Sequence, residues 1–191
     1  MSTVQITQDY YNSTDADEFY YSIWGGEDIH IGIYDTTIDI RQASRLTVEK
    51  MASLVAPTIN EDTVILDLGS GYGGAARYLA SRFRCSVICL NLSEVENKRN
   101  RTRNDEENLA KYITVIEGSY EEIPPAIAER SIDIVWSQDA MLHSAAKPKI
   151  FEEVQRILKD KGHFIFTDPM QSNTADTTRL QPVYDRIHLK E

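Results

Sequence analysis

Five runs of apolar residues recur along the chain from residue 64 onwards, each bounded by polar sequence. They occupy residues 64–68, 86–92, 113–118, 132–138 and 163–168. Each run is almost continuously apolar, without the strict alternation of a half-exposed strand, which is typical of parallel strands buried on both faces of a sheet. The pattern therefore predicts five strands of one buried, parallel sheet.

Segments with helical apolar spacing lie before and between these strands. The expected helices cover residues 41–56, 74–83, 93–110 and 147–159. The sequence KDKG at 159–162 is expected to end the last helix, with Gly162 beyond its C-terminus. Strands that alternate with helices predict an α/β fold, a doubly wound, Rossmann-like parallel sheet with flanking helices. Such sheets bind ligands outside the carboxyl ends of their strands.

The first predicted strand runs directly into a glycine-rich turn, in the sequence VILDLGSGYGG at 64–74. Gly69, Gly71 and Gly73 tolerate positive φ and leave room for a ligand to approach the backbone. Their spacing differs from the dinucleotide fingerprint G-x-G-x-x-G, and the P-loop lysine is missing. Asp67, two residues before the first glycine, would disfavour a phosphate but suits a ligand's ammonium group or the amides of the turn.

Charge and composition exclude several classes of partner. The 191 residues carry a formal net charge of -10, which argues against nucleic acid as a partner. The one basic cluster, KRNRTR at 98–103, lies beside DEEN and is interpreted as a solvated helix face. No apolar run approaches the ~20 residues of a membrane span, and the polar, acidic N-terminus does not resemble a targeting signal. We therefore expect a cytoplasmic protein without a membrane partner.

The two cysteines, Cys85 and Cys89, fall in the second predicted strand. Four residues along a strand span ~13 Å, too far for a disulfide. Their spacing is not that of a metal site, and the chain contains no H-E-x-x-H motif. We interpret both as buried, reduced thiols and expect no metal site.

The stretch LDLGSGYGG resembles the first motif of class I S-adenosylmethionine-dependent methyltransferases. Three further stretches resemble later parts of that family in the same order: GSYEEIP at 118–124, SIDIVWSQDAMLH at 131–143 and RILKDKGHFIFTD at 156–168. The resemblance covers about residues 60–168 and implies S-adenosylmethionine as the cofactor, bound at Asp67 and the three glycines of the turn.

The same resemblance implies further residues that bind the cofactor. Ser119 and Tyr120 lie in the loop that contacts adenine in the family, and Gln138 lies near the methyl donor. Asn91 stands where the family often carries an acid for the ribose hydroxyls. An asparagine binds a hydroxyl without the charge assistance that a carboxylate provides.

Two segments point to a branch of the family. CLNLS at 89–93 is similar to the branch of cyclopropane synthases, tocopherol methyltransferases and small-amine N-methyltransferases. YYSIWGGEDIHIGIY at 20–34 most resembles the sarcosine/dimethylglycine N-methyltransferases of glycine betaine synthesis. The resemblance implies a small-molecule amine as substrate.

Candidate catalytic residues follow from the cationic chemistry of that reaction. Tyr20, Tyr21 and Trp24 are candidates for an aromatic cage, because ring faces attract cations. Packing of a lid explains each of them equally well. His143 lies in the connection after the fourth predicted strand, where it could orient the amine or bind a substrate carboxylate. A histidine that caps a helix is an equal alternative.

The chain is expected to divide into an aromatic lid segment (1–40), a cofactor-binding core (41–168) and a polar tail (169–191). The tail leaves no room for the two antiparallel strands that follow the fifth strand in the family. The open edge then favours a truncated chain or a homodimer. Two alternatives therefore stay open: a module that binds the donor but is inactive, and a C-methyltransferase of a lipid or prenylated ring.

Overall fold

The five predicted strands form one sheet in the computed structural model, which describes residues 3–174 and 176–186. Their order across the sheet is β3-β2-β1-β4-β5, and each strand runs parallel to its neighbours. The connections from β1 and from β4 therefore lead to opposite sides, which leaves a crevice at the carboxyl ends of these central strands. The doubly wound α/β fold is confirmed, with β1 (Val64–Leu68), β2 (Ser86–Asn91), β3 (Ile113–Glu117), β4 (Ile132–Gln138) and β5 (Leu158–Thr167).

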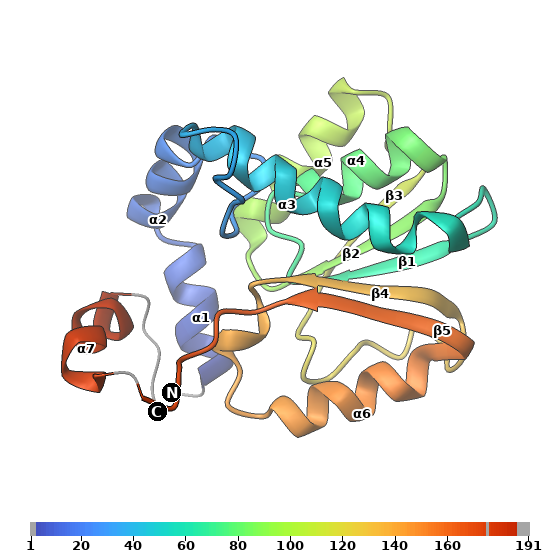
Figure 1. The fold of residues 1–191 in the computed structure, drawn as a ribbon. Helices are drawn as coiled ribbons and strands as arrows, with labels where there is room; N and C mark the ends of the chain where they lie inside the picture. The colour runs from blue at the N-terminus through green and yellow to red at the C-terminus, as the bar shows by residue number, and fades with distance from the viewer. Residues whose placement is uncertain (1–2, 175, 187–191) are drawn as a thin grey trace.

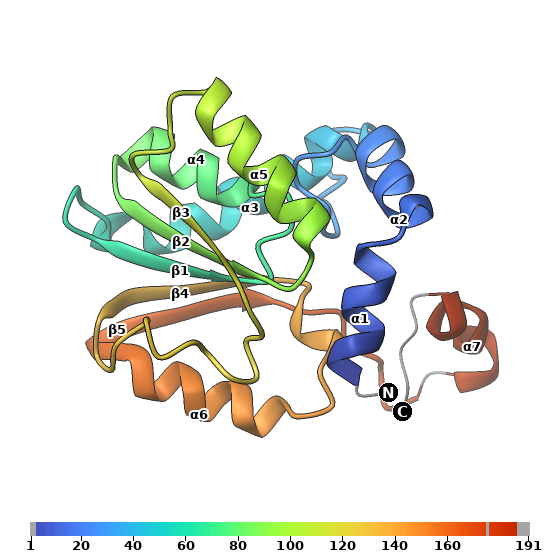
Figure 2. The same ribbon diagram turned by 180° about the vertical axis from the view of Figure 1, so that it is seen from behind.

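Helices cover both faces of the sheet. α3 (Ile40–Val55), α4 (Gly74–Phe83) and α5 (Glu94–Glu106) lie on one face, and α6 (Lys147–Ile157) lies on the other (Figures 1 and 2). Each face has its own apolar core, because successive side chains of a strand point to opposite faces. This double burial explains why the strands read as continuous apolar runs.

The prediction for the last helix is wrong at its C-terminal end. α6 ends at Ile157, and β5 begins at the next residue instead of at residue 163. Leu158 pairs with Ile132, and the register then shifts before Ile134 pairs with His163. Residues 159–162 thus lie opposite the single residue Asp133, in an irregularity near the start of β5. Gly162 therefore belongs to a strand and does not cap a helix.

The N-terminal segment is largely helical and stands across the carboxyl ends of the strands (Figure 1). It comprises α1 (Thr3–Tyr11), α2 (Thr14–Glu18) and a π-helical turn (Phe19–Ile23). Short 3-10 turns follow α3 (Ala56–Thr58) and β4 (Met141–His143). The polar tail contains α7 (Thr177–Arg186), which the sequence analysis does not predict and which holds Pro182 in its interior.

Both cysteines are free and buried, as predicted, although Cys85 precedes β2 instead of lying within it. Burial raises the pKa of the Cys89 thiol to about 12. Within residues 3–174 and 176–186, no helix is both long and apolar enough to cross a membrane.

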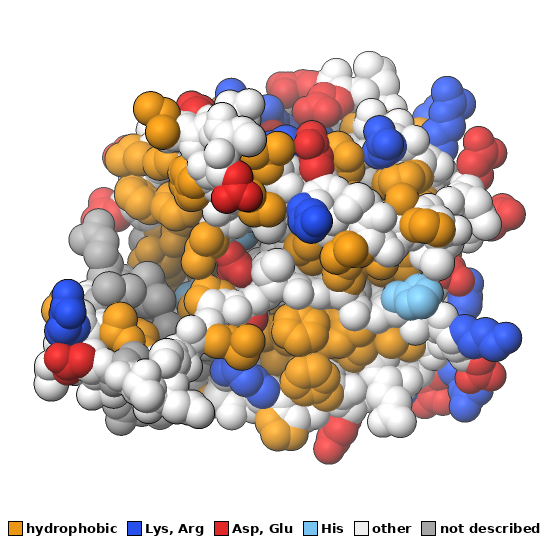
Figure 3. All heavy atoms as spheres, in the orientation of Figure 1, with side chains coloured by type: hydrophobic (Ala, Val, Ile, Leu, Met, Phe, Trp, Pro, Cys, Tyr) orange, Lys and Arg blue, Asp and Glu red, His pale blue; other side chains and the backbone are white. Residues whose placement is uncertain are grey.

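β5 is an edge strand, as expected, and hydrophobic side chains gather over β5 and α6 (Figure 3). Phe151 of α6 packs against Phe164 and Phe166 of β5, with ring centroids 5.9 and 6.3 Å apart. Phe151 and Phe166 remain 47% and 44% exposed. The sheet therefore ends in an accessible apolar surface on this side.

Candidate functional site

The glycine turn after β1 has the backbone that its sequence predicts. Gly69, Gly71 and Gly73 have φ values of +73°, +49° and +79°. A Cβ on Gly69 would lie 2.5 Å from the Cβ of Ala140, and one on Gly73 would lie 2.2 Å from Oδ1 of Asn100. Two of the glycines therefore allow close packing within the protein, while Gly71 faces a hollow.

Two adjoining hollows flank this turn at the carboxyl edge of the sheet. The main hollow has an empty volume of about 530 Å³ and the side hollow one of about 340 Å³, both counted with the space that opens to solvent. They share the residues Ile29, Gly69, Gly71 and Gln138 in their linings. The two hollows thus form an elongated site on both sides of the turn.

Most of the predicted ligand-binding residues line this site. The main hollow contains Gly69, Gly71, Asn91, Tyr120, Gln138 and His143, and the side hollow contains Asp67. Gly73 and Ser119 lie next to lining residues and do not themselves line either hollow. The fold thus brings together side chains that follow β1, β2, β3 and β4.

The three aromatic residues proposed as a cage lie outside both linings. The Trp24 indole donates to the carbonyl of His30 and to Oγ of Ser44, at 3.2 and 3.3 Å. The Tyr21 ring is 45% exposed and lies 4.2 Å from the guanidinium of Arg99. Tyr20 stacks on Tyr11, with centroids 5.8 Å apart. In this arrangement these rings hold the N-terminal segment together behind the wall of the site.

Tyr11, which the sequence analysis does not single out, supplies that wall. Its hydroxyl oxygen lies 2.9 Å from Nε2 of His143, and both residues line the main hollow. Burial, and to a smaller extent the positive charge of Lys147, lowers the pKa of His143 to about 4. Burial also raises the pKa of Tyr11 well above its ordinary value. The pair is therefore uncharged near neutral pH and still offers hydrogen bonds to a bound molecule.

Asn91 and Glu96 form a second pair in the main hollow. Nδ2 of Asn91 donates to Oε2 of Glu96 at 2.9 Å. Oε1 of the same carboxyl group is buried and has no hydrogen-bond partner among the described residues. Burial raises the pKa of Glu96 to about 7, despite the opposing effect of the Asn91 amide. The unpartnered oxygen makes this carboxyl group a strong acceptor for a hydroxyl group of a ligand.

The side hollow is acidic. Asp28 and Asp67 are 5% and 3% exposed. Burial raises the pKa of Asp28 to about 6 and that of Asp67 to about 7, and the charge of Asp28 raises the pKa of Asp67 further. Two buried carboxyl groups that face one hollow form a site for a cationic group.

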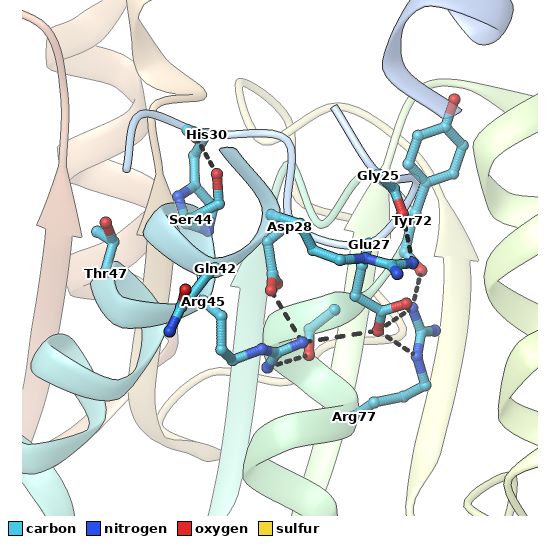
Figure 4. A network of polar contacts seen from close by, with 12 residues as sticks. Gly25, Glu27, Asp28, His30, Gln42, Ser44, Arg45, Thr47, Tyr72 and Arg77 are labelled. Atoms are coloured by element: carbon cyan, nitrogen blue, oxygen red, sulfur yellow. Dashed lines mark hydrogen bonds and ion pairs between the residues drawn. The ribbon is translucent and has the colours of Figure 1, made fainter. Parts of the chain in front are cut away.

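Arginines hold the segment that carries Asp28 (Figure 4). Glu27 accepts ion pairs from Arg77 at 2.8 Å and from Arg103 at 2.5 Å, while Arg45 lies 2.8 Å from Asp28. Because Arg103 belongs to the KRNRTR cluster, the interpretation of that cluster as a merely solvated face is wrong at this position. Its neighbour Arg99 likewise pairs with Asp17 of α2. The cluster binds the N-terminal segment to α5.

A local sequence pattern marks one of these residues, Glu96. Ser93 and Glu96 have the spacing of a capping box, S-x-x-E, and Ser93 does cap α5 by accepting from the amide of Glu96 at 3.2 Å. The glutamate of such a box usually returns to its cap residue, but here it bonds to Asn91. Tyr11 and Asp28 carry no comparable signal. Among residues 3–174 and 176–186, no three His, Cys, Asp or Glu side chains form a group that could hold a metal ion.

A family model described as a methyltransferase domain matches residues 66–166 of this chain. The chain is 52% identical to a glycine/sarcosine/dimethylglycine N-methyltransferase of Actinopolyspora halophila, over 98% of this chain and 33% of that protein. It is 47% identical to a sarcosine/dimethylglycine N-methyltransferase of Halorhodospira halochloris, over 98% of this chain and 66% of that protein. The chain thus spans between a third and two thirds of the length of these relatives.

A solved structure agrees with these relatives. The crystal structure of a candidate sarcosine dimethylglycine methyltransferase from Galdieria sulphuraria superposes with a TM-score of 0.83 at 48% sequence identity. The match covers 92% of this chain and 67% of that chain.

Proposed function

We propose, from the premise that this chain belongs to the methyltransferase domain family, that it is an S-adenosylmethionine-dependent N-methyltransferase. Its proposed acceptor is a small amine such as sarcosine or dimethylglycine, the reaction of glycine betaine synthesis. The observation that carries the proposal is the convergence of three buried carboxyl groups and an uncharged Tyr11–His143 pair on the glycine turn. The relatives, which share 46–52% of their aligned residues with this chain, support the choice of acceptor.

The residues present fit the chemical groups of S-adenosylmethionine. The unpartnered oxygen of Glu96, together with Asn91, suits the ribose hydroxyls. Asp28 and Asp67 in the side hollow suit the ammonium of the amino-acid end. Gly71 lines both hollows, so a ligand that spans them would lie against this residue of the turn.

The protein would act mainly by alignment and exclusion of water. When bound, S-adenosylmethionine supplies a methyl group on a positively charged sulfonium. Displacement of that methyl group by a neutral amine needs an in-line approach and little acid–base assistance. Tyr11 and His143 wall the main hollow without adding charge, so they do not repel the sulfonium or a protonated amine. Their oxygen and nitrogen atoms can orient the acceptor by bonding to the N–H of neutral sarcosine or to the carboxylate that both amines carry.

Transfer of a radioactive methyl group tests the proposal directly. The purified chain is mixed with methyl-labelled S-adenosylmethionine and, in separate reactions, with glycine, sarcosine or dimethylglycine. We expect label in the products from sarcosine and dimethylglycine. Donor binding without transfer to any of the three amines would favour the inactive donor-binding module. A further reaction with a lipid or prenylated ring as acceptor tests the C-methyltransferase, and transfer only to that acceptor would favour it; such an acceptor calls for a more apolar pocket than the acidic side hollow.

A further inference from the structure

Tyr72 occupies the middle of the glycine turn and yet lines neither hollow. It stands between Gly71 and Gly73, both at positive φ, and its side chain is only 1% exposed. Its hydroxyl group donates a hydrogen bond to Oδ1 of Asp17 at 2.9 Å. Because Asp17 belongs to α2, a side chain of the ligand-binding turn is bonded directly to the N-terminal helices.

The acceptor in this bond is a well-held carboxylate. Nε of Arg99 donates to Oδ1 of Asp17 at 2.8 Å, and the second guanidinium nitrogen pairs with Oδ2. Hydrogen bonding to Arg99 is the main cause that lowers the pKa of Asp17. Asp17 is therefore ionised near neutral pH, and the bond from Tyr72 is charge-assisted.

The backbone of Tyr72 makes a second link to the same N-terminal segment. Its carbonyl accepts a hydrogen bond from Nη2 of Arg77 at 2.6 Å, and Nε of Arg77 donates to Glu27 at 2.9 Å. Figure 4 shows Tyr72, Arg77 and Glu27 in this chain of contacts. Glu27 and its neighbour Asp28 line the side hollow. The side chain and the carbonyl of Tyr72 thus connect the turn to both parts of the segment that covers the site.

We infer that Tyr72 is a positioning residue that couples the glycine turn to the lid formed by α1 and α2. The inference rests on the proposed function, because it takes the ligand bound at the glycine turn to be the methyl donor. When the turn is held in one conformation by a ligand, the Tyr72 hydroxyl stays aligned with Asp17, and α1 keeps Tyr11 and Thr7 in the wall of the main hollow. By linkage, closure of the lid strengthens donor binding to the same degree.

Other contacts of α1 and the residue after it reach the segment between β2 and α5 and His143 after β4, so they do not replace the coupling to the glycine turn. Nε2 of Gln8 donates to the carbonyl of Leu92 at 3.1 Å, and Oγ of Ser93 donates to Asn12 at 2.9 Å. These bonds keep α1 near the sheet when the Tyr72 hydroxyl is removed. A variant without that hydroxyl is therefore expected to fold and to have a looser lid.

Hydrogen exchange of residues 3–18 tests the inference with S-adenosylhomocysteine as the probe. We compare the wild type with Tyr72→Phe and with Asp17→Asn, which leaves the turn itself unchanged. Tyr112→Phe is the matched control, because it removes a phenolic hydroxyl just before β3, at the opposite end of the strands. Both test variants should exchange about tenfold faster in residues 3–18, the factor that one hydrogen bond to a charged group supports. They should also lose most of the protection that the probe adds in the wild type.

The Michaelis constants separate positioning from general damage. Tyr72→Phe should raise KM for the amine several-fold and leave kcat within about twofold, since the lid walls the acceptor space and the reacting atoms are unchanged. Protection of residues 3–18 in Tyr72→Phe equal to the wild type would overturn the inference, whatever Asp17→Asn shows, because Asp17→Asn also disturbs the pair with Arg99. If the proposed function is wrong, the wild type transfers no methyl group, and this result is separate from the exchange measurement. Faster exchange in ligand-free Tyr72→Phe would still support the link between turn and lid in that case.

Discussion

The hydroxyl oxygen of Tyr11 lies 2.9 Å from Nε2 of His143, although 132 residues separate the two in the chain. One comes from the first helix and the other from the turn after β4, and their rings meet edge to face. Both residues line the main hollow, so the contact forms part of its wall. The lid and the sheet edge therefore contribute jointly to the space proposed for the acceptor.

Tyr11→Phe is expected to impair use of the amine more than binding of the donor. The change removes the bond to His143 and leaves the aromatic ring, so the loss should be up to about tenfold in kcat/KM, the effect of roughly one hydrogen bond. Donor affinity, measured by calorimetry, should change less than about threefold. An equal loss in donor affinity and in kcat/KM would show that Tyr11 acts on the donor site instead.

Glu96→Gln is expected to weaken donor binding at pH 8 by about 1–3 kcal/mol, because it replaces an acceptor that is ionised at this pH with a neutral one. Calorimetric titration with S-adenosylhomocysteine measures this loss. Glu94→Gln is the control, since Glu94 lies in the same first turn of α5 but outside both linings. A similar loss in both variants would assign the effect to the helix terminus and not to the Glu96 carboxylate.

The same substitution should change the pH dependence of stability. The folded pKa of Glu96 is raised from 4.5 to about 7, so the folded state binds more protons than the unfolded state between these values. This group therefore lowers the free energy of unfolding as the pH rises from about 5 to 8. Relative to the wild type, Glu96→Gln should gain melting temperature over that interval. A constant difference in melting temperature from pH 5 to 8 would contradict the raised pKa.

Donor binding should weaken as the pH falls from 8 to 6. The pKa values of Asp28 and Asp67 are about 6 and about 7, so acidification neutralises carboxyl groups that attract an ammonium. Glu96, whose pKa is also about 7, adds to the effect, whereas His143 does not, because its pKa is lowered to about 4. Calorimetry at pH 6, 7 and 8 measures the effect. Asp28→Asn should flatten the profile, and an unchanged profile in that variant would place the ammonium elsewhere.

Asn91→Asp is expected to weaken donor binding near neutral pH. The new carboxyl group would meet Oε2 of Glu96, which now accepts from the Asn91 amide at 2.9 Å. Two carboxyl groups at this distance cannot both ionise, so they retain a proton and lose an acceptor site. Asn91→Leu should weaken binding as well, by leaving Glu96 without its amide donor. Tighter binding by Asn91→Asp, again by calorimetry, would show that Asn91 contacts the ribose alone.

Gly71→Val should abolish donor binding in a folded protein. Its φ of +49° disfavours a β-branched residue, and the side chain would press on Ile29, which lines both hollows with Gly71. Gly73→Val should instead destabilise the fold, because its Cβ would overlap Asn100. Melting temperature and calorimetry together distinguish the two outcomes. Full donor affinity in Gly71→Val would exclude the turn as the binding site.

The sequence by itself determined the sheet, the turn and the family. Strands buried on both faces must be continuously apolar, and a turn at positive φ beside a ligand must be glycine, so both features are visible in local sequence. Asp67, Asn91, Tyr120, Gln138 and His143 were predictable because parallel strands bring their carboxyl ends to one edge.

Only the tertiary structure decided which side chains complete the site. Tyr11, Asp28 and Glu96 reach the hollows because α1, the segment after the π-helical turn and the start of α5 fold over the sheet edge. No local pattern specifies that packing, since it depends on ion pairs between residues far apart, such as Asp17 with Arg99 and Glu27 with Arg77. For the same reason the sequence could not show that Tyr20, Tyr21 and Trp24 line neither hollow and pack instead on Tyr11, Arg99 and Ser44, respectively.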